Sequence, residues 1–349
     1  MREPDLPKPS IKSLGSARRK PISASAASLL KTEYLGPDMP LPLVVTPAVE
    51  GIHFGTWAGS NREWVATELS KHGGILFRNF RVETAADLEQ FVKAVGGELL
   101  DYSYRSTPRN HVEGKIYTST EYPASQFIPL HNEMAYSRHW PMKIAFHCVK
   151  PAERGGETPI ADSRKVFQRI DPAIREEFMR KKVMYVRNYG DDLDLPWQNV
   201  FQTTSRSEVE DYCRRTGIEF EWKDGDRLRT RQLCQAVAAH PQTGEMVWFN
   251  QAHLFHISGL DPAAVEALLD KFKEEDLPRN SYYGDGSPID PRALAEIREA
   301  YQQEAVIFPW QRGDVLLLDN MLTAHGRTPY AGPRQVRVGM AEPMTSAGL

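Results

Sequence analysis

Short runs of β-branched and apolar residues, separated by turn-forming residues, are the feature that most restricts how this chain can fold. Residues 305–308 and 315–318 are two such runs, and residues 309–314 between them include a proline, a glycine and an aspartate. This pattern predicts two buried strands joined by a tight turn. Residues 334–340 alternate polar and apolar side chains, as a half-buried strand does. The C-terminal part of the chain is therefore predicted to build a β core.

Helical patterns lie between the predicted strands. Residues 85–95 show apolar spacings of three and four and are followed by Gly96 and Gly97, which favours a helix that ends there. The other predicted helices span residues 64–71, 166–180, 209–215, 263–275 and 292–303, and the other predicted strands span residues 74–78, 116–118, 144–149, 183–187 and 245–249. Helices flanking an otherwise antiparallel β core indicate a mostly β (α+β) fold with a double-stranded β-helix, or jelly-roll, core.

The chain is predicted to consist of one domain and an N-terminal arm. Residues 1–38 are rich in proline and serine and contain a basic run at residues 18–20, so they have too little apolar surface to offset the entropy of ordering. They are predicted to form a flexible arm. Residues 39–349 are predicted to form a single jelly-roll domain. A helical insertion at about residues 190–300 is expected to wall the substrate pocket or to make an oligomer contact.

Composition argues against several classes of protein. A formal net charge of −3 gives no long-range attraction to nucleic acid or anionic lipid. No run of about eighteen apolar residues is present, so no membrane-spanning segment is expected. The cysteines Cys148, Cys213 and Cys234 lack metal-site spacing and fit a reducing cytoplasm, with Cys148 predicted to be buried. We expect a cytoplasmic protein without nucleic-acid or membrane partners, either monomeric or a homo-oligomer.

Two His-x-Glu sequences occur, one from His131 to Glu133 and one from His111 to Glu113. In an extended segment residues i and i+2 share a face, so the imidazole and the carboxylate can reach one ion. The apolar residues 127–130 predict a strand that ends at His131, whereas turn formers and charges around His111 predict an exposed loop. His131 and Glu133 are therefore the candidate metal ligands.

A second group of polar residues follows the predicted strand 315–318. Asp319 and Asn320 come directly after it, and His325 lies shortly beyond. Two imidazoles and one carboxylate form the ligand set that holds Fe(II) by one face and leaves positions open for a co-substrate and O₂. His131 and Glu133, combined with His325, therefore predict a non-haem iron oxygenase.

Two further segments offer groups that could bind an anion. Arg334 begins the last predicted strand, where a guanidinium can hold a carboxylate through two parallel hydrogen bonds. The alternative for Arg334 is a surface position on an edge strand. Gly155 and Gly156 permit a turn that other residues would strain to make, after which Thr158 can offer a hydroxyl donor inside a pocket.

Over about residues 50–343 the chain resembles the TauD/TfdA family of Fe(II)- and 2-oxoglutarate-dependent dioxygenases. Within this family it is most similar to the clavaminate synthase and SyrP-like branch. The resemblance lies in the segments HNEMAY (131–136), GGETPIADSR (155–164), DNMLTAHGR (319–327) and RQVRVGM (334–340). It implies Fe(II), 2-oxoglutarate and O₂ as cofactor and co-substrates. It also implies His131, Glu133 and His325 as iron ligands, and Thr158 and Arg334 as partners of the distal carboxylate of 2-oxoglutarate.

The sequence departs from the family pattern at two positions. Many relatives have aspartate where this chain has Glu133, but the longer arm still reaches and remains a suitable ligand for iron. Because halogenating relatives have glycine or alanine there, Glu133 favours oxygenation over halogenation. The interval from His325 to Arg334 is shorter than in several relatives, so Arg337 is a second candidate for binding 2-oxoglutarate.

The resemblance implies oxidative decarboxylation of 2-oxoglutarate to succinate and CO₂, coupled to hydroxylation of an unactivated C–H bond. Relatives in this branch act on amino acids, free or tethered to a carrier protein, so an amino-acid-like substrate is expected. Desaturation, epoxidation and cyclisation at the same site are alternatives that the sequence does not separate from hydroxylation. A non-catalytic jelly-roll protein that binds a ligand is less favoured, because the metal motif is complete.

Some polar residues outside the ligand set are candidates for substrate contacts. Asn132 faces either the substrate or a neighbouring backbone group. Phe249 and Asn250 lie in a segment of aromatic and amide residues suited to a polar-headed small molecule, although part of this segment is expected in the core.

The histidines outside the motifs are predicted to be structural. His147 lies on a predicted strand and is expected in the core. His253 and His256 could meet on one helical turn, but no further ligand for a second metal stands out.

Overall fold

The computed structural model describes residues 29–37, 39–100, 104, 111–119, 122–190 and 195–346. Within these residues, the largest sheet has eight strands in the order β1-β2-β3-β16-β7-β19-β5-β4, and we call it the major sheet. Its strands are β1 (Leu30–Gly36), β2 (Met39–Pro47), β3 (Gly74–Phe77), β4 (His111–Glu113), β5 (Ile116–Thr118), β7 (His139–Lys150), β16 (Val315–Asp319) and β19 (Gln335–Thr345). Neighbouring strands are antiparallel except for β2 and β3, which are parallel.

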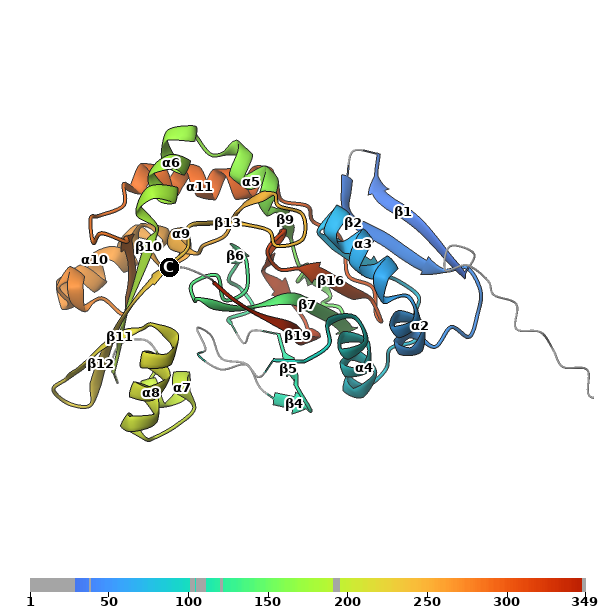
Figure 1. The fold of residues 1–349 in the computed structure, drawn as a ribbon, viewed down its shortest axis with the longest axis horizontal. Coiled ribbons are helices and arrows are strands. Elements are labelled where there is room, and N and C mark those ends of the chain that lie inside the picture. The colour runs from blue at the N-terminus through green and yellow to red at the C-terminus, as the bar shows by residue number, and fades with distance from the viewer. Residues whose placement is uncertain are drawn as a thin grey trace, which may run out of the picture.

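Alternating side chains on β16 explain how both faces of the major sheet are buried. Leu317 packs in the cluster that includes helices α3 (Arg62–His72) and α4 (Ala85–Gly96), whereas Leu316 and Leu318 pack in a cluster on the other face. All three leucines are fully buried, which contributes roughly 2 kcal/mol each. Figure 1 shows α3 and α4 beside this sheet. The helices therefore cover the outer face and leave the inner face to the interior of the barrel.

A second, smaller sheet faces the inner side of the major sheet. Among the described residues it has three strands, ordered β6 (Ile128–His131), β17 (Thr323–Arg327) and β9 (Ile160–Asp162). Phe146 of β7 lies 4.9 Å, between ring centroids, from His325 of β17, so the two sheets are in direct contact. We call this the minor sheet. The two facing sheets with helices outside are the architecture that the sequence predicted.

The segment predicted as a helical insertion also contains strands, which corrects that prediction. The strands β11 (Glu219–Lys223), β12 (Arg227–Cys234) and β15 (Arg279–Tyr283) lie in this segment. They form an antiparallel sheet in the order β11-β12-β10-β15 with β10 (Val183–Tyr189), which lies before the segment and was predicted as a strand over residues 183–187. Thr230 and Gln232 of β12 are buried although they are polar. Because buried polar side chains interrupt the apolar pattern, the strand was not recognised from its sequence.

Further helices and short strands complete the fold. The helices are α2 (Phe54–Ser60), α5 (Ser163–Arg169), α6 (Pro172–Lys181), α7 (Trp197–Phe201), α8 (Arg206–Thr216), α9 (Ala252–Phe255), α10 (Pro262–Lys271) and α11 (Pro291–Gln303), with 3₁₀ turns at Ile257–Gly259 and Glu274–Asp276. The short strands are β8 (Arg154–Gly155), β13 (Val237–Ala239), β14 (Met246–Trp248) and β18 (Tyr330–Ala331). The single helix predicted over residues 166–180 is two helices, because Asp171 caps a new helix that has Pro172 in its first turn.

Three other predictions need correction. The predicted arm included residues 30–36, which instead form β1 and pair with β2; residues 1–28 lie outside the described residues. Residues 305–308 do not form a strand, and Val306 makes only an isolated bridge with Ile160. The predicted loop at His111 is β4, an exposed strand at the edge of the major sheet.

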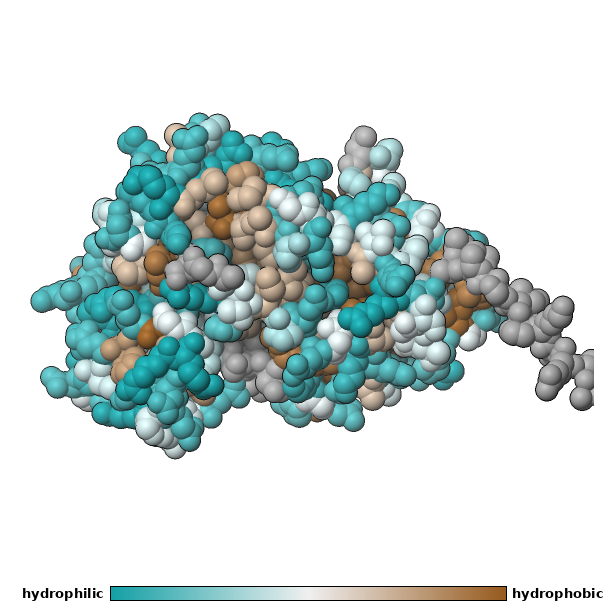
Figure 2. Space-filling view, viewed as in Figure 1, coloured by the Kyte–Doolittle hydropathy of each residue, from teal (hydrophilic) through white to brown (hydrophobic). Residues whose placement is uncertain are grey.

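The surface shown in Figure 2 is mainly polar, with an apolar area near β13. The residues of β13 are partly exposed, which is ordinary for a folded protein. None of the helices in the described part of the chain combines the length and the apolar character of a membrane span. All three cysteines are buried, as predicted for Cys148.

Candidate functional site

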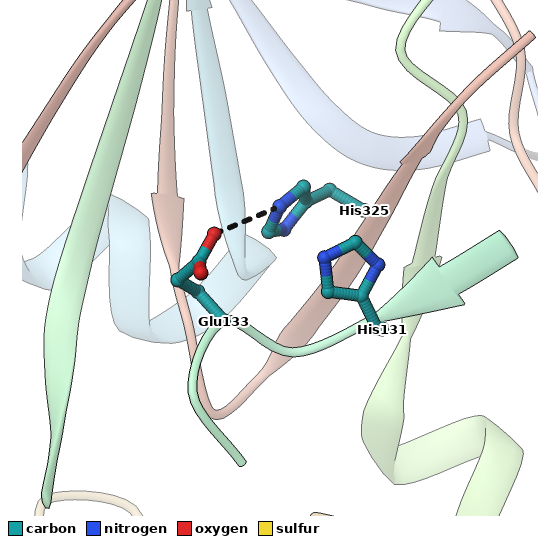
Figure 3. Close-up of side chains that lie close together, drawn as sticks. All are labelled: His131, Glu133 and His325. Carbon is teal, nitrogen blue, oxygen red and sulfur yellow. Dashed lines mark ion pairs between the residues drawn. The ribbon is translucent and has the colours of Figure 1, made fainter. Parts of the chain in front are cut away.

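Three predicted metal ligands come together at the minor sheet. His131 ends β6 and His325 lies on β17, where the two residues are direct cross-strand partners with ring centroids 4.6 Å apart. Glu133 follows two residues after His131, and its Oε2 lies 3.8 Å from Nε2 of His325 (Figure 3). One potential ligand atom from each residue lies within 4.8 Å of the others. Two strands far apart in sequence therefore converge on one small volume, as the sequence predicted.

The orientation of His131 is fixed by its own strand. Nδ1 of His131 lies 2.8 Å from the backbone carbonyl of Pro129. Because a carbonyl only accepts, Nδ1 carries the proton and donates it, which places the lone pair on Nε2. A hydrogen bond of this kind on the outer nitrogen is typical of histidines that bind metals.

The chemistry of the donor set fits a divalent metal ion. Glu133 and His325 are 3% and 4% exposed, so a carboxylate and an imidazole are removed from water side by side. A buried carboxylate needs compensating positive charge. Two imidazole nitrogens and one carboxylate oxygen on a single face match the 2-His-1-carboxylate arrangement of non-haem Fe(II). Within the described residues, this is the one group of three or more His, Cys, Asp or Glu side chains close enough to hold an ion.

A cationic end adjoins the three-residue cluster. Arg334 and Thr158 line the same pocket as His131 and His325. The Nε of Arg334 donates to the carbonyl of Gly156 at 2.8 Å, and its Nη1 donates to Oγ of Ser119 at 3.2 Å. In the described part of the chain no carboxylate forms an ion pair with Arg334.

Burial of Arg334 makes an anionic partner favourable at this end of the pocket. Desolvation, and after it the nearby guanidinium of Arg327, lowers the pKa of Arg334 to about 10. Two neighbouring cations in a partly desolvated site favour an anion between or beside them. Gly156 permits this arrangement, because a Cβ there would lie 2.9 Å from Cδ of Arg334. The glycine turn identified in the sequence therefore makes room for the arginine.

The hydrogen-bonding role of the Thr158 hydroxyl is set by its neighbour Trp310. The indole Nε1 of Trp310 donates to Oγ1 of Thr158 at 3.2 Å, and both side chains are buried. Since an indole N–H can only donate, Thr158 is the acceptor of this bond and keeps its own hydrogen for another partner. Trp310 and Ser119 were not among the predicted site residues. Trp310 lies in the segment predicted as a turn, so no local pattern pointed to it.

Arg337, the second candidate for binding 2-oxoglutarate, points elsewhere. Its Nη1 donates to the carbonyl of Glu83 at 3.2 Å, and it is not among the residues that line the pocket. Arg337 lies on β19 opposite His147, whereas Arg334 precedes that strand. The geometry therefore brings Arg334, but not Arg337, to the site.

The three candidate substrate residues do not line this pocket. For Asn132 the structure shows the alternative that the sequence left open, a bond to a backbone group, and for Phe249 and Asn250 it corrects the prediction. Asn132 is fully buried, and its Nδ2 donates to Oγ of Ser163 and to the carbonyl of Asn320. Asn250 donates to the carbonyl of Ala236. Phe249 is fully buried and packs edge-on against a tryptophan ring. All three side chains are used to hold the interior together.

The other histidines considered in the sequence lie outside the three-residue cluster. His147 is buried, and desolvation lowers its pKa to about 4. His253 stacks on Tyr301, and its Nε2 lies 3.1 Å from the carbonyl of Leu130, with desolvation lowering its pKa to about 3. His111 is exposed. His256 caps a 3₁₀ turn.

Comparison with known proteins identifies the family. The family model described as taurine catabolism dioxygenase TauD, TfdA family, matches residues 34–340. The chain belongs to the TauD/TfdA family. It is 43% identical over 276 residues to the dapdiamide synthesis protein DdaC of Enterobacter agglomerans, which covers 79% of this chain and 84% of that protein. It is also 30% identical over 322 residues to a clavaminate synthase-like protein of Arabidopsis thaliana, covering 87% of this chain and 94% of the relative.

Solved structures agree with the fold of the TauD/TfdA family. PvcB from Pseudomonas aeruginosa superposes with a TM-score of 0.56 at 16% identity, covering 93% of this chain and 97% of PvcB. A second structure of PvcB, described as an Fe, alpha-ketoglutarate dependent oxygenase from an isonitrile synthetic pathway, gives a TM-score of 0.54 at 17% identity, with the same coverage of both chains. The jelly-roll fold predicted from the sequence is thus confirmed. As a member of this family, the protein is a 2-oxoglutarate-dependent dioxygenase, with Fe(II), 2-oxoglutarate and O₂ as cofactor and co-substrates.

Proposed function

We propose that this dioxygenase hydroxylates an unactivated C–H bond of an amino acid or an amino-acid-like molecule, either free or tethered to a carrier protein, and forms succinate and CO₂. The observation that supports the proposal most strongly is the convergence of His131, Glu133 and His325 beside the cationic pair of Arg327 and Arg334. One part of the pocket suits a cation and the adjoining part suits an anion.

In this proposal His131, Glu133 and His325 hold the ferrous ion. Bound iron supplies the activation of O₂ that hydroxylation of an unactivated bond requires. The protein residues have the task of orientation. Pro129 fixes the imidazole of His131, and the ring of Phe146 packs against His325 at 4.9 Å between centroids, so neither imidazole turns freely. Glu133 supplies the negative charge that stabilises a divalent ion in a buried position.

Arg334 and Thr158 are proposed to bind the distal carboxylate of 2-oxoglutarate. Two of the guanidinium nitrogens of Arg334 are already held by Gly156 and Ser119, which orients the group without neutralising it. Thr158 accepts from Trp310 and therefore presents its hydrogen to an acceptor. A cation and a hydroxyl donor are complementary to a carboxylate.

The substrate class is inferred from the biosynthetic pathways and products that appear in the names of the relatives. DdaC is named for dapdiamide synthesis, PvcB is described from an isonitrile synthetic pathway, and a relative from Fischerella ambigua, 22% identical over 280 residues, is named as an isocyanoethenyl-indole synthase. These names support a small molecule of specialised metabolism as the substrate. Epoxidation, desaturation and cyclisation are the second candidates, because each would use the same metal site.

The test is turnover with defined substrates. Purified protein with Fe(II), 2-oxoglutarate and O₂ is incubated with a panel of amino acids and with the same amino acids loaded on a carrier protein, and succinate and product mass are measured. Hydroxylation adds one oxygen atom, as epoxidation of a C=C bond also does, and the proton NMR spectrum of the product distinguishes these two. Desaturation or ring closure removes two hydrogens. The expected result is substrate-dependent succinate release that His131→Ala abolishes. His111→Ala, in the exposed His-x-Glu sequence, is the matched control. Equal succinate release by His131→Ala would contradict the proposal.

A further inference from the structure

A buried asparagine side chain holds the backbone of Glu133. Asn320 is fully buried, and its Oδ1 accepts a hydrogen bond from the N–H of Glu133 at 2.7 Å. Its Nδ2 donates to the carbonyl of Glu133 at 2.9 Å and to the carbonyl of Pro141 at 2.8 Å. Both donors and the acceptor of the amide are therefore engaged, and two of the three bonds go to the same residue.

Asn320 is itself fixed on both sides. Its backbone N–H donates to the carbonyl of Met142 on β7 at 2.8 Å. The preceding residue, Asp319, accepts from the N–H groups of Met321 and Leu322 at 3.0 Å each, which shapes the turn that leads into β17 and His325. One residue thus links the strand of His325 to the backbone of Glu133.

The loop at Glu133 needs such support. Met134, the next residue, has a φ of 57°, in the left-handed region that a branched or long side chain adopts only at a cost in free energy. The carbonyl of Asn132 accepts from Nε2 of Gln251 at 2.7 Å, so the residue before Glu133 is also held by an amide. Buried amides on both sides therefore maintain a backbone conformation that is unfavourable by itself.

We propose that Asn320 is a positioning residue, which fixes the peptide groups of Glu133 and thereby aims its carboxylate at the metal ion. This inference rests on the proposed function, because it takes His131, Glu133 and His325 as the metal site. An amide suits the position because it combines one acceptor with two donors. Aspartate would keep the acceptor for the N–H of Glu133 but would face two carbonyl groups without a donor.

The test compares metal binding in Asn320→Ala and Asn188→Ala. Asn188 is a matched control, because it is buried, donates to the carbonyls of Glu275 and Leu277, and accepts from Nε of Arg229. It therefore makes the same number of bonds in the four-stranded sheet β11-β12-β10-β15. Dissociation constants for Mn²⁺ are measured under anaerobic conditions from the electron paramagnetic resonance of unbound Mn²⁺, below the melting temperature of each variant.

We expect Asn320→Ala to weaken Mn²⁺ binding by about 10-fold or more, as loss of a residue that orients a metal ligand does. Asn188→Ala should lower the melting temperature but leave the Mn²⁺ constant within about twofold of the wild type, since the partners of Asn188 are Glu275, Leu277 and Arg229 and none of them is a predicted ligand. Asn320→Asp replaces the side chain with one of almost the same shape and should also weaken Mn²⁺ binding. If the alanine variant does not fold, the aspartate variant is compared with the wild type instead. The visible spectrum of bound Co²⁺ should shift in either Asn320 variant.

Two results would overturn the inference, and they are distinguishable. If the wild type binds Mn²⁺ and the Asn320 variants bind it equally well, Asn320 has no positioning role, while the proposed function stands. If the wild type binds no Mn²⁺ at this site, the proposed function fails as well, and the positioning role fails with it.

Discussion

The two ends of the site are built in opposite ways: the metal end, which is proposed to hold the iron, and the anion end, which is proposed to hold the distal carboxylate of 2-oxoglutarate. The metal end consists of His131, Glu133 and His325, which lie on two neighbouring strands and a short loop, and it presents lone pairs. The anion end consists of Thr158 and Arg334, which come from a glycine turn and the start of the last strand, and it presents hydrogens and positive charge. A ligand that chelates a cation at one end and carries a carboxylate at the other complements both.

The difference shows how each end is stabilised. Direct cross-strand pairing places His131 beside His325, so the backbone of the minor sheet sets their separation. At the anion end, side chains set the geometry, because Arg334 is held by Gly156 and Ser119 and Thr158 is held by Trp310. Changes at the two ends should therefore separate into effects on metal affinity and effects on 2-oxoglutarate affinity.

Loss of the carboxylate at the metal end should have the largest effect. Glu133→Ala removes the only anionic group of the three predicted ligands, so we expect Mn²⁺ affinity to fall on the order of 100-fold or more and succinate formation to stop. Glu113→Ala, in the exposed β4, is the control and should behave as the wild type. Full turnover by Glu133→Ala would remove Glu133 from the ligand set.

Loss of the guanidinium at the anion end should weaken the binding of 2-oxoglutarate. Arg334→Gln is expected to raise the KM for 2-oxoglutarate by about 30-fold or more, since losing one partner of a desolvated ion pair costs about 2–5 kcal/mol. Mn²⁺ affinity without 2-oxoglutarate should not change. Arg337→Gln is the matched control, because Arg337 contacts the carbonyl of Glu83 rather than the pocket. A larger rise in KM for Arg337→Gln would exchange the roles of the two arginines.

The loss of folding stability at acid pH should arise from a residue outside both ends of the site, His147. The unfolded chain protonates His147 near its ordinary pKa of 6.5, whereas burial lowers the pKa in the folded state to about 4. The unfolded state therefore binds the extra proton first, and folding stability falls as the pH drops from about 6.5 towards 4, by roughly 2 kcal/mol at pH 5. His147→Gln should lose less stability between pH 7 and pH 5 in urea titrations. An unchanged pH dependence would mean that His147 is not a source of acid sensitivity.

Removing the indole donor should have the smallest effect. Trp310→Phe keeps the aromatic bulk but releases the hydroxyl of Thr158 to rotate, which is worth about 1 kcal/mol for one hydrogen bond. The KM for 2-oxoglutarate should rise about fivefold at constant Mn²⁺ affinity. An unchanged KM for 2-oxoglutarate would mean that Trp310 does not set the orientation of the Thr158 hydroxyl.

The two ends also differ in how far the sequence predicts them. His131 and Glu133 were predicted from residues alone, because i, i+2 spacing at the end of an apolar strand is a local signal. Thr158 and Arg334 were singled out from the residues as groups that could bind an anion, but their role towards 2-oxoglutarate came from the family resemblance. Trp310 was missed, because its contact with Thr158 depends on tertiary folding. Phe249 and Asn250 were misassigned, because composition does not reveal that a protein carbonyl already satisfies the amide.

The same reasoning explains the outcome for the fold. Apolar runs such as residues 315–318 were predicted correctly as strands, since alternate leucines fill opposite faces of the major sheet. Residues 305–308 have a similar composition but bridge only at Val306, because strand formation also needs a partner along the whole run. Strand β12 was missed, because its buried threonine and glutamine conceal the apolar pattern.

Anaerobic visible absorbance of the protein with Fe(II) tests most directly whether the two ends hold one chelated co-substrate. Addition of 2-oxoglutarate should produce a weak charge-transfer band in the wild type. The band should be absent in Glu133→Ala and should need a higher 2-oxoglutarate concentration in Arg334→Gln. A wild type without the band, or a band that forms equally well in both variants, would contradict the account.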